Sequence, residues 1–168
     1  MTKYDPDIHN RRSIRLKGYD YSKAGLYFVT ICTQNHLCLF GNIDNGKMVL
    51  NDAGIMVGCQ WQLLTSRFDK IKLHNFVVMP NHFHGIIEFV GVPLVGTQNT
   101  VGDVLGVLKS LSTNEYIRGV NKNWKPFDKK LWQRNYFEHI IRSEKSYYQI
   151  TEYIKTNPMK WQEDKYFV

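Results

Sequence analysis

His82 and His84 are the residues of this sequence whose spacing most directly suggests chemistry. They lie in the segment MPNHFHG at residues 79–85, where Pro80 and Asn81 form a turn that opens a predicted strand. Residues two apart on a strand point to the same face, so both imidazoles project together. Two neutral imidazoles so placed can hold one divalent metal and leave coordination positions open for substrate oxygens. Spacing alone leaves open a pair of structural or solvated histidines.

A tyrosine near the C-terminus is the second candidate. The predicted last helix carries an apolar stripe formed by Tyr147, Ile150 and Ile154. Tyr153 lies at the flank of that stripe, about 60° from Ile150 at roughly 100° per residue. Asn157 follows four residues later, over the same helix face. The hydroxyl of Tyr153 can therefore face the histidines as a nucleophile, with the amide oxygen of Asn157 beside it as a third metal ligand.

The helix pattern also allows other interpretations. Tyr153 can be a core residue, since large rings supply much of core burial, and Asn157 can be the helix stop that precedes Pro158. Tyr147 and Tyr148 are competing nucleophiles by chemistry alone. The pattern by itself does not choose among these alternatives.

The elements that must position these residues follow from hydrophobic periodicity. Strands are predicted at residues 25–34, 70–79, 82–90 and 136–142, a small hairpin at 37–50, and helices at 51–66, 101–119 and 143–156. The order is βαββαβ with one further helix. The expected fold class is therefore α+β, a ferredoxin-like antiparallel sheet plus a C-terminal helix that carries Tyr153. Residues 1–168 form one domain, with a basic N-terminal arm at residues 1–24.

The composition favours a polyanionic partner. Lys and Arg outnumber Asp and Glu by 22 to 15, which gives a net charge of +7, and 14% of the residues are aromatic. Basic grooves that follow the backbone and rings that stack on bases suit single-stranded nucleic acid. Trp124 and Trp132 border a basic loop and either stack bases or belong to the core. Candidate backbone contacts are Arg11, Arg12, Arg15, Lys17, Lys109, Lys122, Lys125 and Arg134.

Other features of the sequence indicate where in the cell the protein acts. The chain has no apolar run of the roughly 20 residues that span a membrane, and its polar N-terminus lacks a signal core. Its three cysteines have no metal-like spacing and fit reduced thiols. We therefore expect a cytoplasmic protein without a membrane partner. His36 and His74 have no partner by spacing and are expected at the surface, whereas Glu138 and His139 are assigned to structure.

Two motifs together resemble a known family. VVMPNHFHGIIE at residues 77–88 resembles the HUH motif (His, bulky hydrophobic, His) of tyrosine transposases. EYIKTNP at residues 152–158 resembles the tyrosine-bearing helix of the REP-associated tyrosine transposase branch. Further similar blocks are IRLKGYDYSKAGLYFVTICTQNH at 14–36, LFG at 39–41 and LWQRNYFEHIIR at 131–142. Because these blocks occur in order over most of the chain, their combination is much more specific than either motif.

The resemblance implies a mechanism. His82, His84 and Asn157 match the family's metal ligands, with Mg²⁺ or Mn²⁺ as the metal, and Tyr153 matches the nucleophile. The implied activity is metal-dependent nicking and rejoining of single-stranded, hairpin-forming DNA in DNA transposition, through a covalent 5′-phosphotyrosine. A homodimer in which Tyr153 serves the partner's histidines is possible in such a family.

Three alternatives remain at this point. The first is a domesticated DNA-repeat-binding protein that does not transpose. The second is a small HxH metal hydrolase or dioxygenase, which predicts an Asp or Glu as third ligand. Glu88 has the right strand parity, but its Cα lies some 13 Å from that of His84 at about 3.3 Å per residue. The third is a single-strand binding module with a vestigial site.

Overall fold

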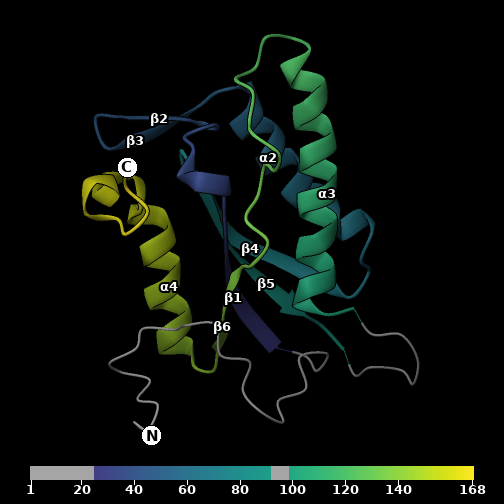
Figure 1. Ribbon diagram of the computed structural model, residues 1–168. Coiled ribbons are helices and arrows are strands. Elements are labelled where there is room, and N and C mark those ends of the chain that lie inside the picture. The colour runs from purple at the N-terminus through teal and green to yellow at the C-terminus, as the bar shows by residue number, and fades with distance from the viewer. Residues whose placement is uncertain (1–24, 92–98) are drawn as a thin grey trace, which may run out of the picture.

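A four-stranded antiparallel sheet forms the centre of the molecule (Figure 1). The computed structural model describes residues 25–91 and 99–168. The strands are β1 (Gly25–Cys32), β4 (Ile71–Val78), β5 (His82–Phe89) and β6 (Phe137–Ile141), in the order β4-β5-β1-β6. The helices are α2 (Asp52–Gln62), α3 (Val101–Val120) and α4 (Glu144–Thr156). This arrangement confirms the predicted α+β order of strands and helices.

Shorter elements complete the chain. The hairpin of β2 (Gly41–Asp44) and β3 (Lys47–Leu50) forms a separate two-stranded sheet, as predicted. Short 3₁₀ helices span Gln34–His36, Leu63–Ser66 and Pro158–Glu163. The last of these, η3, continues α4 beyond the predicted stop and had not been expected. The four basic residues predicted for the N-terminal arm, Arg11, Arg12, Arg15 and Lys17, lie outside the described residues.

Strand parity divides the interior into two layers. Helices α2 and α3 cover one sheet face and α4 the other (Figure 1). Phe83 and Ile87 of β5 point into the larger core with α2 and α3. The neighbouring residue Ile86 joins a smaller cluster under α4 that also contains Phe28, Ile141 and Ile154. Because His82 and His84 share the parity of Ile86, they face α4.

Side-chain caps explain where the helices begin. The Asn51 side chain accepts a hydrogen bond from the Gly54 amide at α2, and Ser143 does the same for Ser146 at α4. Thr100 and Asp103 form a reciprocal capping box at α3. Such caps satisfy amides that have no partner inside the helix. Asn51 and Ser143 are also the first residues of the helices predicted at 51–66 and 143–156.

No helix in the part of the chain that the structure describes is long and apolar enough to cross a membrane.

Gly85 follows His84 on β5 and packs against the larger core, so it gives a test of the packing there. A Cβ at this residue would lie 2.7 Å from Cζ2 of Trp61 and 2.9 Å from Cε1 of Phe83. Both rings are fully buried, so they cannot move aside cheaply. We expect Gly85→Ala to lower the free energy of unfolding by about 1–3 kcal/mol, as overpacking does, measured by urea denaturation. The control Gly106→Ala, where a Cβ meets open space in α3, should not destabilise the protein.

Candidate metal and nucleophile site

The histidine pair is held at the start of β5 by a fixed turn. The Met79 amide donates to the carbonyl of His82 at 2.8 Å, which closes the turn through Pro80 and Asn81. His82 and His84 are 0% and 1% exposed, and their ring centroids lie 4.6 Å apart. The structure therefore places the two imidazoles side by side on one face, as strand parity predicted.

The tautomer of His82 is set by its neighbour. The Asn81 amide nitrogen donates to the carbonyls of His36 and Tyr166, at 3.2 Å and 2.7 Å. These bonds turn the Asn81 oxygen toward His82, whose Nδ1 donates to it at 2.8 Å. The proton is thereby fixed on Nδ1, and Nε2 keeps its lone pair. That Nε2 is buried and has no hydrogen-bond partner among the described residues, which is the state of an imidazole ready to bind a metal.

His84 is held in a similar way. Thr30, its cross-strand partner in β1, places its hydroxyl 2.7 Å from Nδ1. The ring also stacks on Phe28, with centroids 5.3 Å apart. The remaining nitrogen, Nε2, faces the hydroxyl of Tyr153 at 3.5 Å. Both rings thus have Nδ1 occupied by a neighbour and Nε2 directed into one shared space.

Tyr153 of α4 lies at the edge of that space. Its ring packs 5.3 Å from the ring of His84 and 6.0 Å from that of Phe28, and the residue is 40% exposed. The hydroxyl is therefore close to the histidines while the side chain is open to solvent. Burial and the charge of Asp164 raise the pKa of this phenol, whereas the side chain of Asn157 lowers it. The hydroxyl is protonated at neutral pH and needs activation to act as a nucleophile.

The competing tyrosines of α4 lie elsewhere. The Tyr147 hydroxyl is 3.0 Å from Nδ1 of His74, whose Nε2 is 2.9 Å from Glu88. Tyr148 is 59% exposed. The side chain of His74 is 26% exposed, so it lies partly at the surface, and it has two partners that its spacing did not predict. His36 is also partly buried, and its ring stacks on Tyr166. Both contacts link residues far apart in the sequence, which spacing could not reveal.

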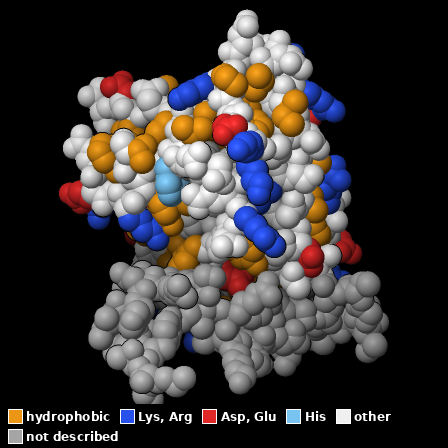
Figure 2. All heavy atoms as spheres, in the orientation of Figure 1, with side chains coloured by type: hydrophobic (Ala, Val, Ile, Leu, Met, Phe, Trp, Pro, Cys, Tyr) orange, Lys and Arg blue, Asp and Glu red, His pale blue; other side chains and the backbone are white. Residues whose placement is uncertain are grey.

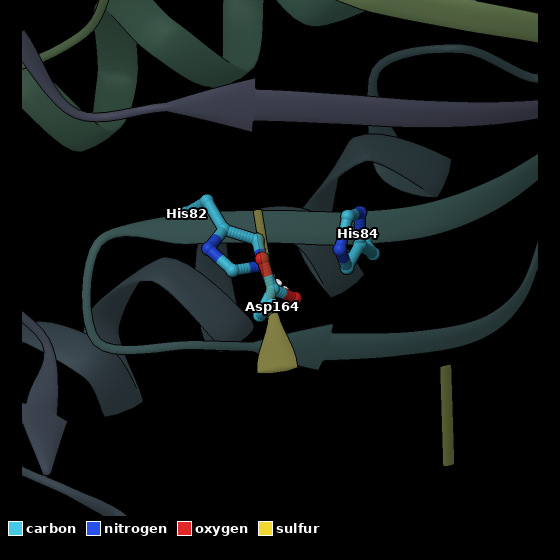
Figure 3. Close-up of side chains that lie close together, drawn as sticks. All are labelled: His82, His84 and Asp164. Atoms are coloured by element: carbon cyan, nitrogen blue, oxygen red, sulfur yellow. Dashed lines mark ion pairs between the residues drawn. The ribbon is translucent and has the colours of Figure 1, made fainter. Parts of the chain in front are cut away.

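Two oxygen-bearing side chains complete the group. Asn157 is 2% exposed, and its Oδ1 is buried without a hydrogen-bond partner in residues 25–91 and 99–168. Its Nδ2 donates to Asp164 Oδ2 at 3.1 Å, and that oxygen lies 3.9 Å from His82 Nε2. Figure 3 shows the two imidazoles on one strand and Asp164 reaching them from the C-terminal segment. His82, His84 and Asp164 bring potential ligand atoms within 4.8 Å of one another, so this group could hold a metal ion.

Asp164 was missed by the sequence analysis. It follows η3 (Pro158–Glu163), and the segment folds back because Asn81 donates to the Tyr166 carbonyl and Tyr166 donates to the Asp164 carboxylate. No periodicity relates Asp164 to the histidines. Because the last helix was predicted to end before Pro158, nothing in the sequence indicated that the chain folds back toward the sheet after it. Asn157, the residue predicted as the third ligand, lies beside Asp164 and donates a hydrogen bond to it.

Burial controls the protonation of the histidines. Desolvation lowers the pKa of His82 to about 4, although Asp164 and Asn157 oppose this. Desolvation and the neighbouring His82 hold the pKa of His84 well below its usual value. Both imidazoles are therefore neutral at physiological pH, as metal ligation requires.

These pKa values predict how the metal-free protein responds to acid. Below pH 6.5 the unfolded chain protonates both histidines, whereas the folded chain protonates His82 only at about pH 4 and holds the pKa of His84 well below its usual value. The free energy of unfolding should therefore fall as the pH drops through this window, by up to about 1.4 kcal/mol per pH unit for each histidine. Urea titrations in chelator should show a steeper fall for the wild type than for His82→Gln/His84→Gln. Equal slopes would contradict the burial of two neutral imidazoles.

The predicted DNA-contacting residues have mixed surroundings. Lys122, Lys125 and Arg134 are exposed, and Figure 2 shows Lys and Arg side chains gathered down one face of the molecule. Lys109 instead donates to the carbonyls of Gln133, Arg134 and Asn135 at 2.8–3.2 Å. Burial lowers its pKa to about 8. Lys109 therefore secures the segment before β6.

The two tryptophans are structural. Trp132 is 5% exposed, and its Nε1 donates to Ser112 at 2.9 Å, which settles the two interpretations in favour of the core. Trp124 packs against Gly119 and lies 5.3 Å from the ring of Tyr116. Glu138 is buried and the adjacent His139 is exposed, as expected for neighbours on a strand.

Comparison with known proteins fits this geometry. The family model described as "Transposase IS200 like" matches residues 64–157, a span that contains both histidines, Tyr153 and Asn157. An uncharacterized protein of Haemophilus influenzae is 44% identical over 99% of this chain and 98% of its own. A second protein of that organism, named "Putative REP-associated tyrosine transposase", is 26% identical over 84% of this chain and 74% of its own.

The fold is also found among solved structures. The structure of a REP-associated tyrosine transposase bound to a REP hairpin superposes with a TM-score of 0.59 and 20% identity, over 95% of this chain and 74% of that one. At this identity the likeness concerns the fold. The family model and the sequence relatives carry the assignment: the chain belongs to the IS200-like transposase family.

Proposed function

We propose that this protein is a metal-dependent enzyme that nicks and rejoins single-stranded, hairpin-forming DNA through a covalent 5′-phosphotyrosine at Tyr153. The observation that carries the proposal is the position of the Tyr153 hydroxyl, 3.5 Å from Nε2 of a neutral, buried His84. His82 beside it has an Nε2 without a partner. A nucleophile next to an incomplete ligand set is the arrangement that phosphodiester transesterification needs.

In the proposed reaction the phenol oxygen of Tyr153 attacks phosphorus as the bond to the 3′-oxygen breaks. The phenolic proton leaves to water, which the 40% exposed side chain can reach, and the departing 3′-oxygen takes up a proton from water. The phosphotyrosine conserves the energy of the phosphodiester, so an incoming 3′-hydroxyl can rejoin strands without ATP. The Asn157 side chain favours the reactive form, because it lowers the pKa of Tyr153 against the opposing effects of burial and Asp164.

His82, His84, Asn157 and Asp164 fit a divalent metal. Nε2 of His82 and Oδ1 of Asn157 are buried, and neither has a hydrogen-bond partner in the part of the chain that the structure describes. Unpaired buried polar atoms are costly unless a ligand satisfies them. The carboxylate oxygen of Asp164 and the amide oxygen of Asn157 suit Mg²⁺ or Mn²⁺. When bound, such a metal supplies charge withdrawal from a non-bridging phosphate oxygen. We place Asp164 beside Asn157 as a ligand that the motif alone did not suggest.

Asp164 also provides the carboxylate that a small HxH metal hydrolase would need. The family membership and the tyrosine at the site favour the transposase-type reaction instead. A domesticated repeat-binding protein would keep the hairpin affinity without the covalent step. A homodimer remains a prediction, but the contact of Tyr153 with His84 of the same chain supports action within one subunit.

The proposal is tested with labelled synthetic hairpin DNA that carries randomised unpaired flanks, incubated with Mn²⁺ or Mg²⁺. We expect a covalent protein–DNA adduct that survives denaturation, with a free 3′-hydroxyl on the released strand. A fully paired duplex of the same sequence should give no adduct. Equal cleavage of duplex and single strand would contradict the substrate assignment, and hairpin binding without any adduct would support the domesticated binder.

Asn81 should matter although it does not touch the substrate. Without its side chain, Nδ1 of His82 loses its acceptor and the tautomer is no longer fixed. Removal of such an outer partner typically weakens metal binding by about 10–100-fold, and we expect this loss for Asn81→Ala in calorimetric titration with Mn²⁺. The matched variant Asn42→Ala, on the exposed strand β2, should bind as the wild type does. Unchanged affinity in Asn81→Ala would show that His82 is not a ligand.

A further inference from the structure

Lys165 is a charged residue of the C-terminal segment that neither motif includes. Its ammonium lies 4.6 Å from the ring centroid of Tyr166 and 5.4 Å from that of Phe137 on β6. Cation–π contacts of this length orient a lysine without removing its capacity to donate hydrogen bonds to an anion. Lys165 is also exposed, so a DNA backbone can reach it.

The surrounding rings connect Lys165 to the reaction site. Tyr166 packs 4.6 Å from the ring of His82 and 6.3 Å from that of His84. Phe137 packs on Phe28, which in turn contacts the ring of Tyr153, each at 6.0 Å. The ammonium therefore lies over the rings of Tyr166 and Phe137. Through Tyr166 and Phe28, these rings contact both the histidines and Tyr153.

The backbone on either side of Lys165 is fixed. The Asp164 carboxylate accepts hydrogen bonds from Asn157 Nδ2 and from the Tyr166 amide, at 3.1 Å and 2.7 Å. On the other side, the Tyr166 carbonyl accepts from Asn81 at 2.7 Å. These anchors fix the backbone from which the Lys165 side chain extends, and the two rings orient its ammonium. A charge held in place gives more electrostatic stabilisation to a reacting group.

The positive charge of Lys165 lies close to the histidines. Its ammonium is 4.6 Å from the ring centroid of Tyr166, and that ring is 4.6 Å from the ring of His82. An attacked phosphodiester gains negative charge as the phenol oxygen adds, so a nearby cation stabilises it more as the reaction proceeds.

We propose that Lys165 binds the non-bridging oxygens of the phosphate that Tyr153 attacks, as a cation supplied by the C-terminal segment. This inference rests on the proposed function, because it needs a DNA phosphate at the site. It makes Lys165 a catalytic residue that lies outside residues 64–157, the span matched by the family model. The alternative is that Lys165 has a structural role and packs the C-terminal segment against Phe137 and Tyr166.

The test separates charge recognition from packing. In the Tyr153→Phe background, which cannot react, binding is measured for two DNAs that differ at the scissile phosphate, one natural and one an uncharged methylphosphonate. The scissile position is mapped beforehand from the product 3′ end made by the wild type. Lys165→Met keeps an aliphatic side chain over the rings but removes the charge, and Lys160→Met removes a charge from an exposed position of the same segment.

We expect Lys165→Met to weaken binding of the natural DNA about five- to tenfold, as loss of one charge-assisted hydrogen bond does, and binding of the methylphosphonate DNA less than twofold. Lys160→Met should affect both DNAs alike, and Lys165→Arg should retain the preference for the charged phosphate. Equal weakening of both DNAs by Lys165→Met, no weakening, or loss of the preference in Lys165→Arg would overturn the proposal. Failure of the proposed function would appear separately, as absence of any adduct with the wild type.

Discussion

Tyr153→Phe should abolish the covalent protein–DNA adduct and reduce strand cleavage by about 10³-fold or more, since it removes the atom that forms the new bond. The ring contacts with His84 and Phe28 are kept, because only the hydroxyl is lost. The variant should therefore fold, bind the hairpin and bind Mn²⁺ much as the wild type does. Adduct formation is measured by denaturing electrophoresis of labelled hairpin DNA.

The other tyrosines of α4 provide the matched controls. Tyr148→Phe changes an exposed residue, and Tyr147→Phe removes a hydroxyl that contacts His74. Both should still form adduct. If Tyr153→Phe forms adduct while either control does not, the nucleophile has been misassigned.

His82→Ala is the variant with the second largest expected effect. It removes Nε2, a buried atom of the candidate metal group that has no hydrogen-bond partner in the described part of the chain. Loss of a ligand should weaken Mn²⁺ binding by more than the roughly 10–100-fold loss expected for an outer partner. Cleavage should fall about 10²–10³-fold, since charge stabilisation worth several kcal/mol is lost and each 1.4 kcal/mol is tenfold in rate.

The variant also removes a buried ring next to Asp164, so its stability must be measured in parallel. His139→Ala, which removes an exposed side chain of β6, is the control and should cleave normally. Adduct formation by a folded His82→Ala protein at the wild-type rate, in the presence of chelator, would contradict a metal-dependent reaction.

Local pattern was sufficient for most of the fold. Alternation along β5 predicted that His82 and His84 share a face, and the structure confirms this because Phe83 and Ile87 lie in the opposite core. Helical spacing likewise predicted that Tyr153 lies at the flank of the apolar stripe of α4, and the residue is 40% exposed. Both conclusions depend only on the geometry of one element, which the sequence encodes directly.

The remaining features depend on contacts between distant segments. Asp164 reaches the histidines because Asn81, more than 80 residues away, holds the Tyr166 carbonyl. Lys109 is withdrawn from solvent by three carbonyls of the segment before β6. Neither arrangement follows from periodicity or propensity, because each is decided by where the chain returns in space.

The central claim is that Tyr153 becomes covalently joined to DNA. Its most direct test is proteolysis of the wild-type adduct formed with hairpin DNA, nuclease trimming of the DNA, and mass spectrometry of the peptides. We expect the nucleotide mass on the peptide that contains Tyr153, attached through a 5′-phosphate. The same mass on Tyr147, Tyr148 or Tyr166, or cleavage that leaves no nucleotide on the protein, would contradict the mechanism.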